Sequence, residues 1–258
     1  MTLVVAAVCP HPPLLVPRVG AGEPVAAREP ALAAVRRLRA ANPDVVVLVG
    51  DDPGALATRA RAYPPTAVGD FRGFGVDYRV RLGTAGESRS VGGSGPADPP
   101  EELPLSLAVG AWLLAATGWD VPRRGLGVSP RTESARAAAL GADLAGGADR
   151  VALLVMGDGS ARRTPKAPGS LDERAEPYDA AVERALAGVD LDALLALEPG
   201  LAADLLVAGR ASWQVLAGAV RAVGATAGAG RWTAEMLYAD APYGVGYFVG
   251  LWRPEVSA

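Results

Sequence analysis

Four short apolar runs rich in β-branched residues, each bounded by turn residues, limit the folds open to this 258-residue chain. They are TLVVAAV (2–8), DVVVLVG (44–50), RVALLVMGD (150–158) and GYFVGLW (246–252). Longer stretches with helical spacing of apolar residues separate them, and this alternation favours a mostly parallel central sheet with helices on both faces. We therefore predict an α/β fold, formed by a single domain over residues 1–258.

The helical stretches follow from their apolar faces and their end signals. After the first run, Leu32, Val35 and Leu38 share one helical face, and Asn42–Pro43 stops the helix before the second run. Further helical patterns cover residues 103–118, 131–147 and 176–223.

Two of these stretches carry candidate capping residues, and a segment ahead of both has no helical pattern. Thr132 or Ser134 is the candidate cap of the helix that starts near residue 131, and Asp190 is a candidate cap within 176–223. Residues 83–102 hold almost no large apolar side chain, so we expect a flexible loop there.

Charge and composition exclude several classes of protein. The formal net charge is -3 without a basic stripe, so we expect no nucleic-acid partner. No uninterrupted apolar segment reaches the roughly 18 residues of a membrane span, so we expect no membrane partner. Cys9 is the one cysteine, which excludes an internal disulfide and fits a reducing compartment, for which the cytoplasm is the expectation.

Polar side chains follow or precede the apolar runs, where ligands of doubly wound sheets collect. His11, the only histidine of the chain, follows the first run. The other polar residues at run ends are Asp51 and Asp52 after the second run, Asp158 and Ser160 after the third, and Glu235, Tyr238, Asp240 and Tyr243 before the last. A parallel sheet would bring these groups to one rim.

These residues allow more than one chemistry. His11 with Asp51 or Asp52 and with Glu235 could hold a divalent metal, because Fe(II), Mn(II) and Zn(II) accept nitrogen and oxygen ligands together. The alternative is that the aspartates brace loops and that the histidine donates to a backbone carbonyl.

Two other kinds of site stay open on the residues alone. Ser160 or Cys9 could act as a nucleophile with His11 as its base, although no third orienting group is evident. The segment MGDGSARR (156–163) could offer backbone N–H groups to an anion, but it lacks the spacing and the lysine of a phosphate loop.

Taken in order, four segments resemble one protein family. They are VCPHPPLL (8–15), VVVLVGDDPG (45–54), LLVMGDGSARRTPKAPG (153–169) with YDAAVERAL (178–186), and APYGVGYFVGLW (241–252). Over about residues 3–252 the chain resembles the catalytic subunits of the class III extradiol ring-cleavage dioxygenases, with their MEMO-type relatives, and within them an uncharacterised actinobacterial branch.

The resemblance implies one α/β domain with a pocket at one end of its sheet. Active members hold a ferrous ion with two histidines and a glutamate, and a further histidine acts as acid or base when catechols are opened. His11 matches the first metal histidine, and Glu235 is our placement for the glutamate.

The chain departs from this pattern at both other histidines. It has GDDPG (50–54) where the second metal histidine is expected, and Ala161 where the acid/base histidine is expected. An Asp51 or Asp52 ligand would favour harder ions than Fe(II). Loss of the proton relay would remove about 10²–10⁴-fold in rate. We therefore do not expect standard catechol cleavage.

Further residues of the same segments are candidates for binding and catalysis. Arg162 and Arg163 could bind an anionic ligand, since guanidinium groups recognise carboxylates and phosphates, or could lie in solvent. Tyr243 is a candidate for substrate binding, and Asp158 and Ser160 are candidate catalytic residues.

Three functions are compatible with these residues and with the resemblance. The first is a dioxygenase-like protein with a degenerate metal site that retains a cleft for a small molecule or a metal. The second is an active non-haem metal enzyme, an oxidoreductase or hydrolase, with a divalent ion (Fe, Mn or Zn) at His11. The third is a noncatalytic interaction protein, and self-association into a homo-oligomer is compatible with all three.

Overall fold

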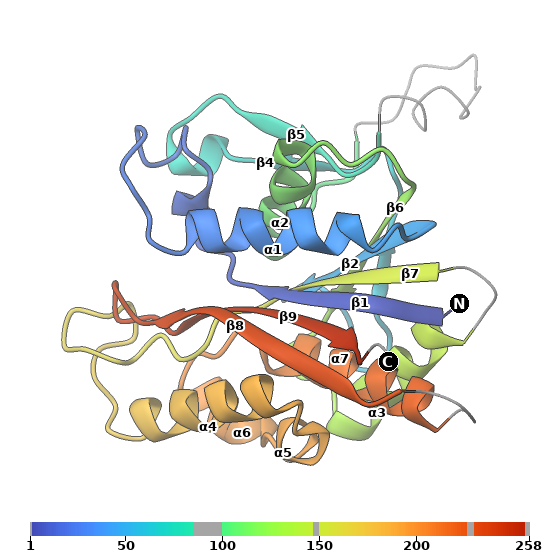
Figure 1. Cartoon of the computed structure of the whole chain (residues 1–258). Coiled ribbons are helices and arrows are strands. Elements are labelled where there is room, and N and C mark those ends of the chain that lie inside the picture. The colour runs from blue at the N-terminus through green and yellow to red at the C-terminus, as the bar shows by residue number, and fades with distance from the viewer. Residues whose placement is uncertain (1, 85–99, 147–149, 226–229, 256–258) are drawn as a thin grey trace.

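The computed structural model describes residues 2–84, 100–146, 150–225 and 230–255 (Figure 1). One seven-stranded sheet, in the order β3-β6-β2-β7-β1-β9-β8, lies between two layers of helices, which confirms the predicted α/β class. Its strands are β1 (Thr2–Cys9), β2 (Val45–Asp51), β3 (Arg61–Tyr63), β6 (Arg123–Val128), β7 (Arg150–Met156), β8 (Trp232–Asp240) and β9 (Tyr247–Pro254). A separate two-stranded sheet joins β4 (Val68–Asp70) to β5 (Arg79–Arg81).

The four apolar runs form β1, β2, β7 and β9. Parallel pairing joins β1 to β7, β7 to β2, and β2 to β6. The last run differs, because β9 is antiparallel to both β1 and β8. Only residues 241–246 connect β8 to β9, and so short a connection permits a hairpin but no crossover. The start of β9 therefore lies at the edge where β1 ends.

The helices divide between the two faces of the sheet (Figure 1). One face is covered by α1 (Arg28–Ala40) and α2 (Leu105–Ala116). The other is covered by α3 (Ser134–Ala145), α4 (Ala175–Gly188), α5 (Leu191–Leu195), α6 (Pro199–Asp204) and α7 (Arg210–Gly224). Short 3-10 turns occur at Pro13–Leu15 and Arg72–Phe74. No helix in the described ranges is long and apolar enough to span a membrane.

Side chains of the central strands point alternately to the two faces of the sheet, and so they contribute to the hydrophobic core on each face. In β1, Val5, Ala7 and Cys9 are buried against the layer of α1 and α2. Ala6 and Val8 are buried against the layer of α3, α4 and α7. Because successive side chains of a strand point to opposite faces, the run TLVVAAV is apolar throughout.

A close contact between α3 and α7 depends on two glycines. A methyl group at Gly141 would overlap the backbone carbonyl of Val215, and one at Gly218 would overlap the backbone of Ala138. The two helix backbones therefore touch, which fixes the middle of α7 against α3.

The local predictions had mixed outcomes. The cap at Asp190 is confirmed, since its carboxylate accepts the N–H of Ala193 at 3.0 Å. The cap at Thr132 or Ser134 is wrong: Glu133 occupies the N-cap without a side-chain bond, and the Ser134 hydroxyl donates to the carbonyl of Leu195. Of the predicted flexible loop 83–102, residues 85–99 lie outside the described residues.

Candidate functional site

The carboxyl ends of β1, β2 and β7 meet at one rim of the sheet. Parallel pairing places Cys9 beside Met156, and the Gly157 N–H donates to the Cys9 carbonyl at 2.9 Å. On the other side of β7, Val49 pairs with Val155. The segments that carry His11, Asp51 and Asp158 therefore leave the sheet next to one another.

His11 and Asp158 make the closest polar contact at this rim. The backbone N–H of His11 donates to Oδ1 of Asp158 at 2.7 Å. The ring Nδ1 of His11 lies 3.6 Å from the same oxygen, beyond hydrogen-bond distance, and it has no hydrogen-bond partner among the described residues. The His11 side chain is 9% exposed, so Nδ1 is a buried polar atom directed at a carboxylate. Burial raises the pKa of Asp158, and the neighbouring His11 opposes this rise.

Asp51 ends β2 and adds a second carboxyl group to the rim. Its backbone carbonyl accepts the buried hydroxyl of Ser106, from α2, at 2.6 Å. Burial raises the pKa of Asp51 to about 7, the charges of Asp52 and Asp158 add to this rise, and Arg210 opposes it. At neutral pH the Asp51 carboxyl therefore exists in both protonation states, and can donate or accept a hydrogen bond.

Arg210, at the start of α7, is the cation that acts on Asp51, and sequence reasoning did not identify it. Its side chain is buried, and it donates to Oε1 of Gln214 and to the carbonyls of Pro130 and Thr132 at 2.6–2.7 Å. Burial lowers the pKa of Arg210. These bonds hold the guanidinium in place between the start of α7 and the segment before α3.

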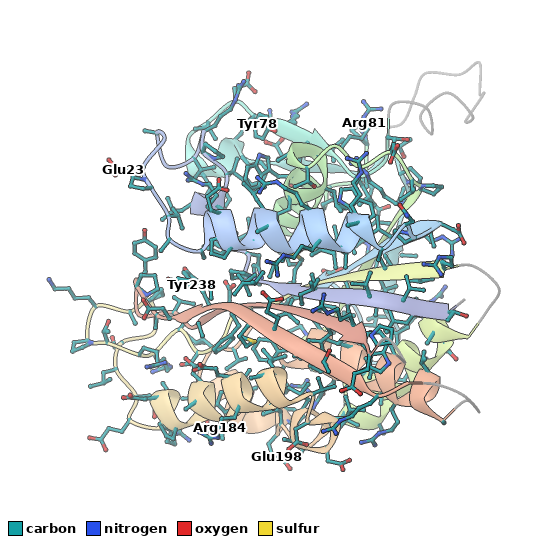
Figure 2. The ribbon with its side chains drawn as sticks, viewed as in Figure 1. Glu23, Tyr78, Arg81, Arg184, Glu198 and Tyr238 are labelled. Atoms are coloured by element: carbon teal, nitrogen blue, oxygen red, sulfur yellow. The ribbon has the colours of Figure 1, made fainter. Side chains whose placement is uncertain are left out.

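Three tyrosines extend the site towards the start of β9. Burial raises the pKa of Tyr247, and Asp158, Tyr243 and Tyr238 contribute in the same direction. The rings of Tyr243 and Tyr247 are 6.4 Å apart, and Tyr243 is 45% exposed. Figure 2 shows Tyr238 on the part of β8 that lies towards the loops of this rim. The predicted residue Tyr243 thus lies at the solvent side of a group of aromatic rings.

Asp52 is not free to act as a ligand. Its Oδ2 accepts the hydroxyl of Tyr63 at 2.8 Å, and its Oδ1 accepts the N–H of Gly54 at 2.9 Å. A methyl group at Gly127 of β6 would overlap this carboxylate. Asp52 therefore braces the segment after β2 against β6 and β3.

Glu235 lies away from the rim cluster. It is in β8, the outermost strand, opposite Leu251 of β9. Its Oε1 is 2.6 Å from Nη1 of Arg37 in α1, and its side chain is 43% exposed. The structure thus gives Glu235 an ion pair near the middle of the outer strand rather than a place beside His11.

These positions allow a test of the metal site that the resemblance implies. No group of three or more His, Cys, Asp or Glu side chains in the described part of the chain is arranged to hold a metal ion. The unpartnered Nδ1 of His11 is available, but Asp52 and Glu235 are bonded elsewhere. The residues present do not fit an ion held by two histidines and a glutamate.

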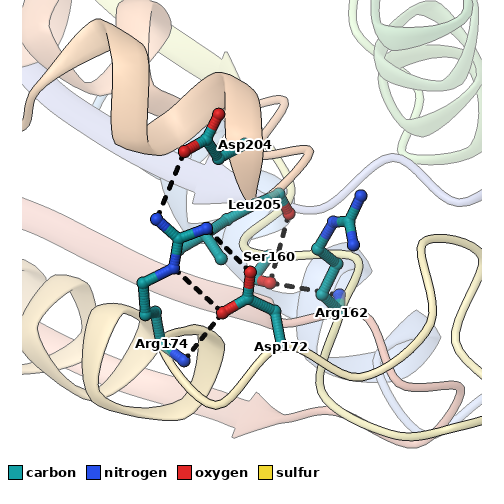
Figure 3. Close-up of polar contacts among 6 residues, drawn as sticks. All are labelled: Ser160, Arg162, Asp172, Arg174, Asp204 and Leu205. Carbon is teal, nitrogen blue, oxygen red and sulfur yellow. Dashed lines mark hydrogen bonds and ion pairs between the residues drawn. The ribbon is translucent and has the colours of Figure 1, made fainter.

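Ser160 occupies a buried turn rather than an open nucleophile position (Figure 3). Its hydroxyl donates to the Leu205 carbonyl at 3.2 Å and accepts the N–H of Arg162 at 3.1 Å. The residue is fully buried, and both functions of its hydroxyl are engaged. The nearby ion pairs in Figure 3 join Arg174 to Asp172 and Asp204.

Asp179 of α4 is a buried acid that sequence reasoning missed. It accepts the Ser160 N–H at 2.8 Å and pairs with Nη1 of Arg163 at 3.2 Å. Burial raises its pKa to about 6, against the effect of both of these bonds. A methyl group at Gly159 or Gly246 would overlap its carboxylate, so it ties the loop after β7 to the loop before β9.

Arg162 and Arg163, the candidates for binding an anionic ligand, have different partners. Arg163 is engaged by Asp179, and its Nη2 is 3.8 Å from Glu176. The Nε of Arg162 is buried without a hydrogen-bond partner among the described residues. The two guanidinium groups thus have separate surroundings.

Two hollows of the described structure lie away from the rim cluster. A hollow of about 500 Å³ lies between the end of α7 and the start of β8, and one of about 450 Å³ lies beside residues 54–62. His11, Asp51 and Asp158 line neither of them.

Fold and site together define an α/β protein with an acidic rim site around one histidine. The sequence matches no protein-family model and no curated protein. Among solved structures, an uncharacterized protein, JW3007, from Escherichia coli K12 is similar, with a TM-score of 0.52 and 15% identity. The alignment covers 97% of this chain and 99% of that one, so the likeness concerns the whole fold and shows the fold alone.

Proposed function

We propose that this protein is a dioxygenase-like binding protein that takes a small organic ligand at the rim of His11, Asp51 and Asp158 without a resident iron ion. The observation that carries the proposal is the buried, unpartnered Nδ1 of His11, directed at the carboxylate of Asp158. A buried polar atom without a partner costs free energy, and a ligand that supplies a hydrogen bond removes this cost.

The surroundings of the rim support a function other than extradiol cleavage. That reaction, as implied by the resemblance, needs a second metal histidine and an acid/base histidine, and His11 is the only histidine of the chain. Ala161, at the expected acid/base position, has no titratable side chain.

The retained groups can bind and orient a ligand. The N–H of His11 holds Oδ1 of Asp158, which preorganises this carboxyl group, and β2 holds the backbone of Asp51 at the rim. Asp51 can donate a hydrogen bond in its protonated form and accept one in its ionised form. The location that fits the fully buried thiol of Cys9 is a reducing one such as the cytoplasm.

The test compares ligand binding with metal dependence. Metal-stripped protein should bind catechol in a calorimetric or NMR titration, and His11→Gln should weaken this binding. Reconstitution with Fe(II), Mn(II) or Zn(II) should give neither stoichiometric metal nor oxygen consumption with catechol.

Glu235→Gln is the matched control. It should leave ligand binding unchanged, because Glu235 pairs with Arg37 on another part of the molecule. One equivalent of bound metal that is lost in both His11→Gln and Glu235→Gln would refute the proposal and support a metal enzyme. If none of the tested ligands binds at the rim, the proposal is refuted and an interaction protein is favoured.

A further inference from the structure

We infer that the ligand of the rim carries a protonated amine, whose ammonium nitrogen lies between Nδ1 of His11 and the carboxylate of Asp158. This inference rests on the proposed function and names the chemical class of its ligand. Three observations carry it: the spacing of the two acceptor atoms, the charge around them and the aromatic rings beside them.

The two acceptor atoms have a spacing that one nitrogen donor can bridge. Nδ1 of His11 and Oδ1 of Asp158 are 3.6 Å apart, so a donor nitrogen can lie about 2.9 Å from both. In the neutral tautomer of His11 that carries its proton on Nε2, Nδ1 accepts a hydrogen bond, and an ammonium group, with three N–H donors and no acceptor, then suits the pair of atoms. The N–H of His11 already fixes Oδ1, so the carboxylate needs no rearrangement.

The charge around the site favours a cation. The charges of Asp52 and Asp158 raise the pKa of Asp51, and the charge of Arg210 lowers it. The guanidinium of Arg210 is directed at Gln214 and at two backbone carbonyls. An ammonium group would offset the cost of the buried carboxylates, whereas a carboxylate or phosphate ligand would add to it.

Aromatic rings beside the carboxylates favour an organic cation over a simple ion. Tyr247 lies close enough to Asp158 to be affected by its charge, and the Tyr243 ring lies 6.4 Å from the Tyr247 ring, towards solvent. The faces of such rings attract alkylammonium groups. The carbon part of the ligand can therefore contact tyrosine while its nitrogen reaches His11.

Two competing occupants fit less well. A neutral alcohol has one donor hydrogen and can donate to only one of the two acceptor atoms at a time. Zn(II) and non-haem Fe(II) sites use at least three protein ligands, and no such group is arranged among the described residues. A protonated amine can donate to both atoms at the same time, and it needs no further protein ligand.

The test uses the whole chain, free of metal, with benzylamine, and with benzyl alcohol as a neutral probe of the same shape. NMR titration near neutral pH should show that benzylamine binds at least about tenfold more tightly, the ratio expected for one charge-assisted hydrogen bond. The signals that move should include the amides of residues 9–12 and 157–160.

Asp158→Asn is the decisive variant, because the amide oxygen can still accept the N–H of His11 while the charge is lost. It should reduce the affinity for benzylamine to that for benzyl alcohol, and Glu235→Gln should leave both unchanged. If Asp158→Asn does not fold, Asp51→Asn provides the second variant, with a smaller loss in the same direction.

The results separate this inference from the proposed function. Equal affinity for the two probes, or a preference for the amine that survives loss of the charge, overturns the inference. Catechol or benzyl alcohol binding at the rim would then leave the proposed function standing. If amine, alcohol and catechol all fail to bind, both are overturned.

Discussion

Replacement of Asp51 with asparagine should stabilise the protein at alkaline pH and flatten the dependence of its stability on pH. The pKa of Asp51 is raised from 3.8 to about 7 by burial and by two neighbouring carboxylates. The folded state therefore binds the Asp51 proton more tightly than the unfolded state does. Stability falls as the pH rises from the unfolded pKa towards the folded one, and the loss is complete above about pH 7.

The size of the effect follows from the two pKa values. Full ionisation of Asp51 in the folded protein costs about 4 kcal/mol relative to the unfolded chain, as an upper value. Between pH 5 and pH 8, linkage predicts that the wild type loses about 2.5 kcal/mol more than Asp51→Asn does. For a chain of this length the difference corresponds to roughly 5 °C in the unfolding midpoint.

The assay is urea unfolding of both proteins across this pH range, followed by circular dichroism. Asp120→Asn is the control, because the Asp120 side chain is 78% exposed and its carboxylate lies 3.7 Å from Nη2 of Arg39, at the surface. If the wild type and Asp51→Asn lose stability with the same slope, Asp51 does not carry a raised pKa and the electrostatic description of the rim is refuted.

Three further predictions concern the contact between α3 and α7 and the surroundings of Asp51, and each can be measured by chemical unfolding or NMR. Gly141→Ala should destabilise the protein by about 3 kcal/mol, since its methyl would overlap the backbone of α7, whereas Gly200→Ala meets open space and should be neutral or slightly stabilising. Ser106→Ala removes the hydroxyl bonded to the Asp51 carbonyl and should cost about 1 kcal/mol. Arg210→Met should raise the Asp51 titration midpoint in carboxyl NMR, and an unchanged midpoint would contradict the coupling of the two groups.

The sequence was sufficient to predict the α/β class and the strands β1, β2 and β7. Their runs are apolar on both faces, a pattern that buried parallel strands require. It did not reveal β6, because Gly125 and Gly127 interrupt its apolar pattern and two arginines start it. These glycines are needed where Leu82 and Asp52 pack against the strand.

The site was harder to predict because adjacent residues at a strand end have different surroundings. Asp51 and Asp52 were equal candidates in the sequence, and only tertiary contacts with Tyr63 and Gly127 separate their roles. Glu235 was placed by its distance from APYGVGYF along the chain, but the β8–β9 hairpin carries it back along the sheet.

Arg210 and Asp179 were missed for a different reason. Charged residues of amphipathic helices are usually solvated, so pattern reasoning assigns them to the surface. Their burial depends on partners distant in the sequence, namely the carbonyls of Pro130 and Thr132 for Arg210, and the Ser160 N–H for Asp179.

The position of β1 between β7 and β9 has a consequence for how this chain is made. On the ribosome β1 is synthesised well before either of its neighbours in the sheet. Until residues 247–254 have been added, β1 keeps an apolar edge with unpaired backbone groups, which is the kind of edge that other chains can join. The tyrosine side of the site, which includes Tyr247, is thus completed late, because β9 is synthesised last of the strands.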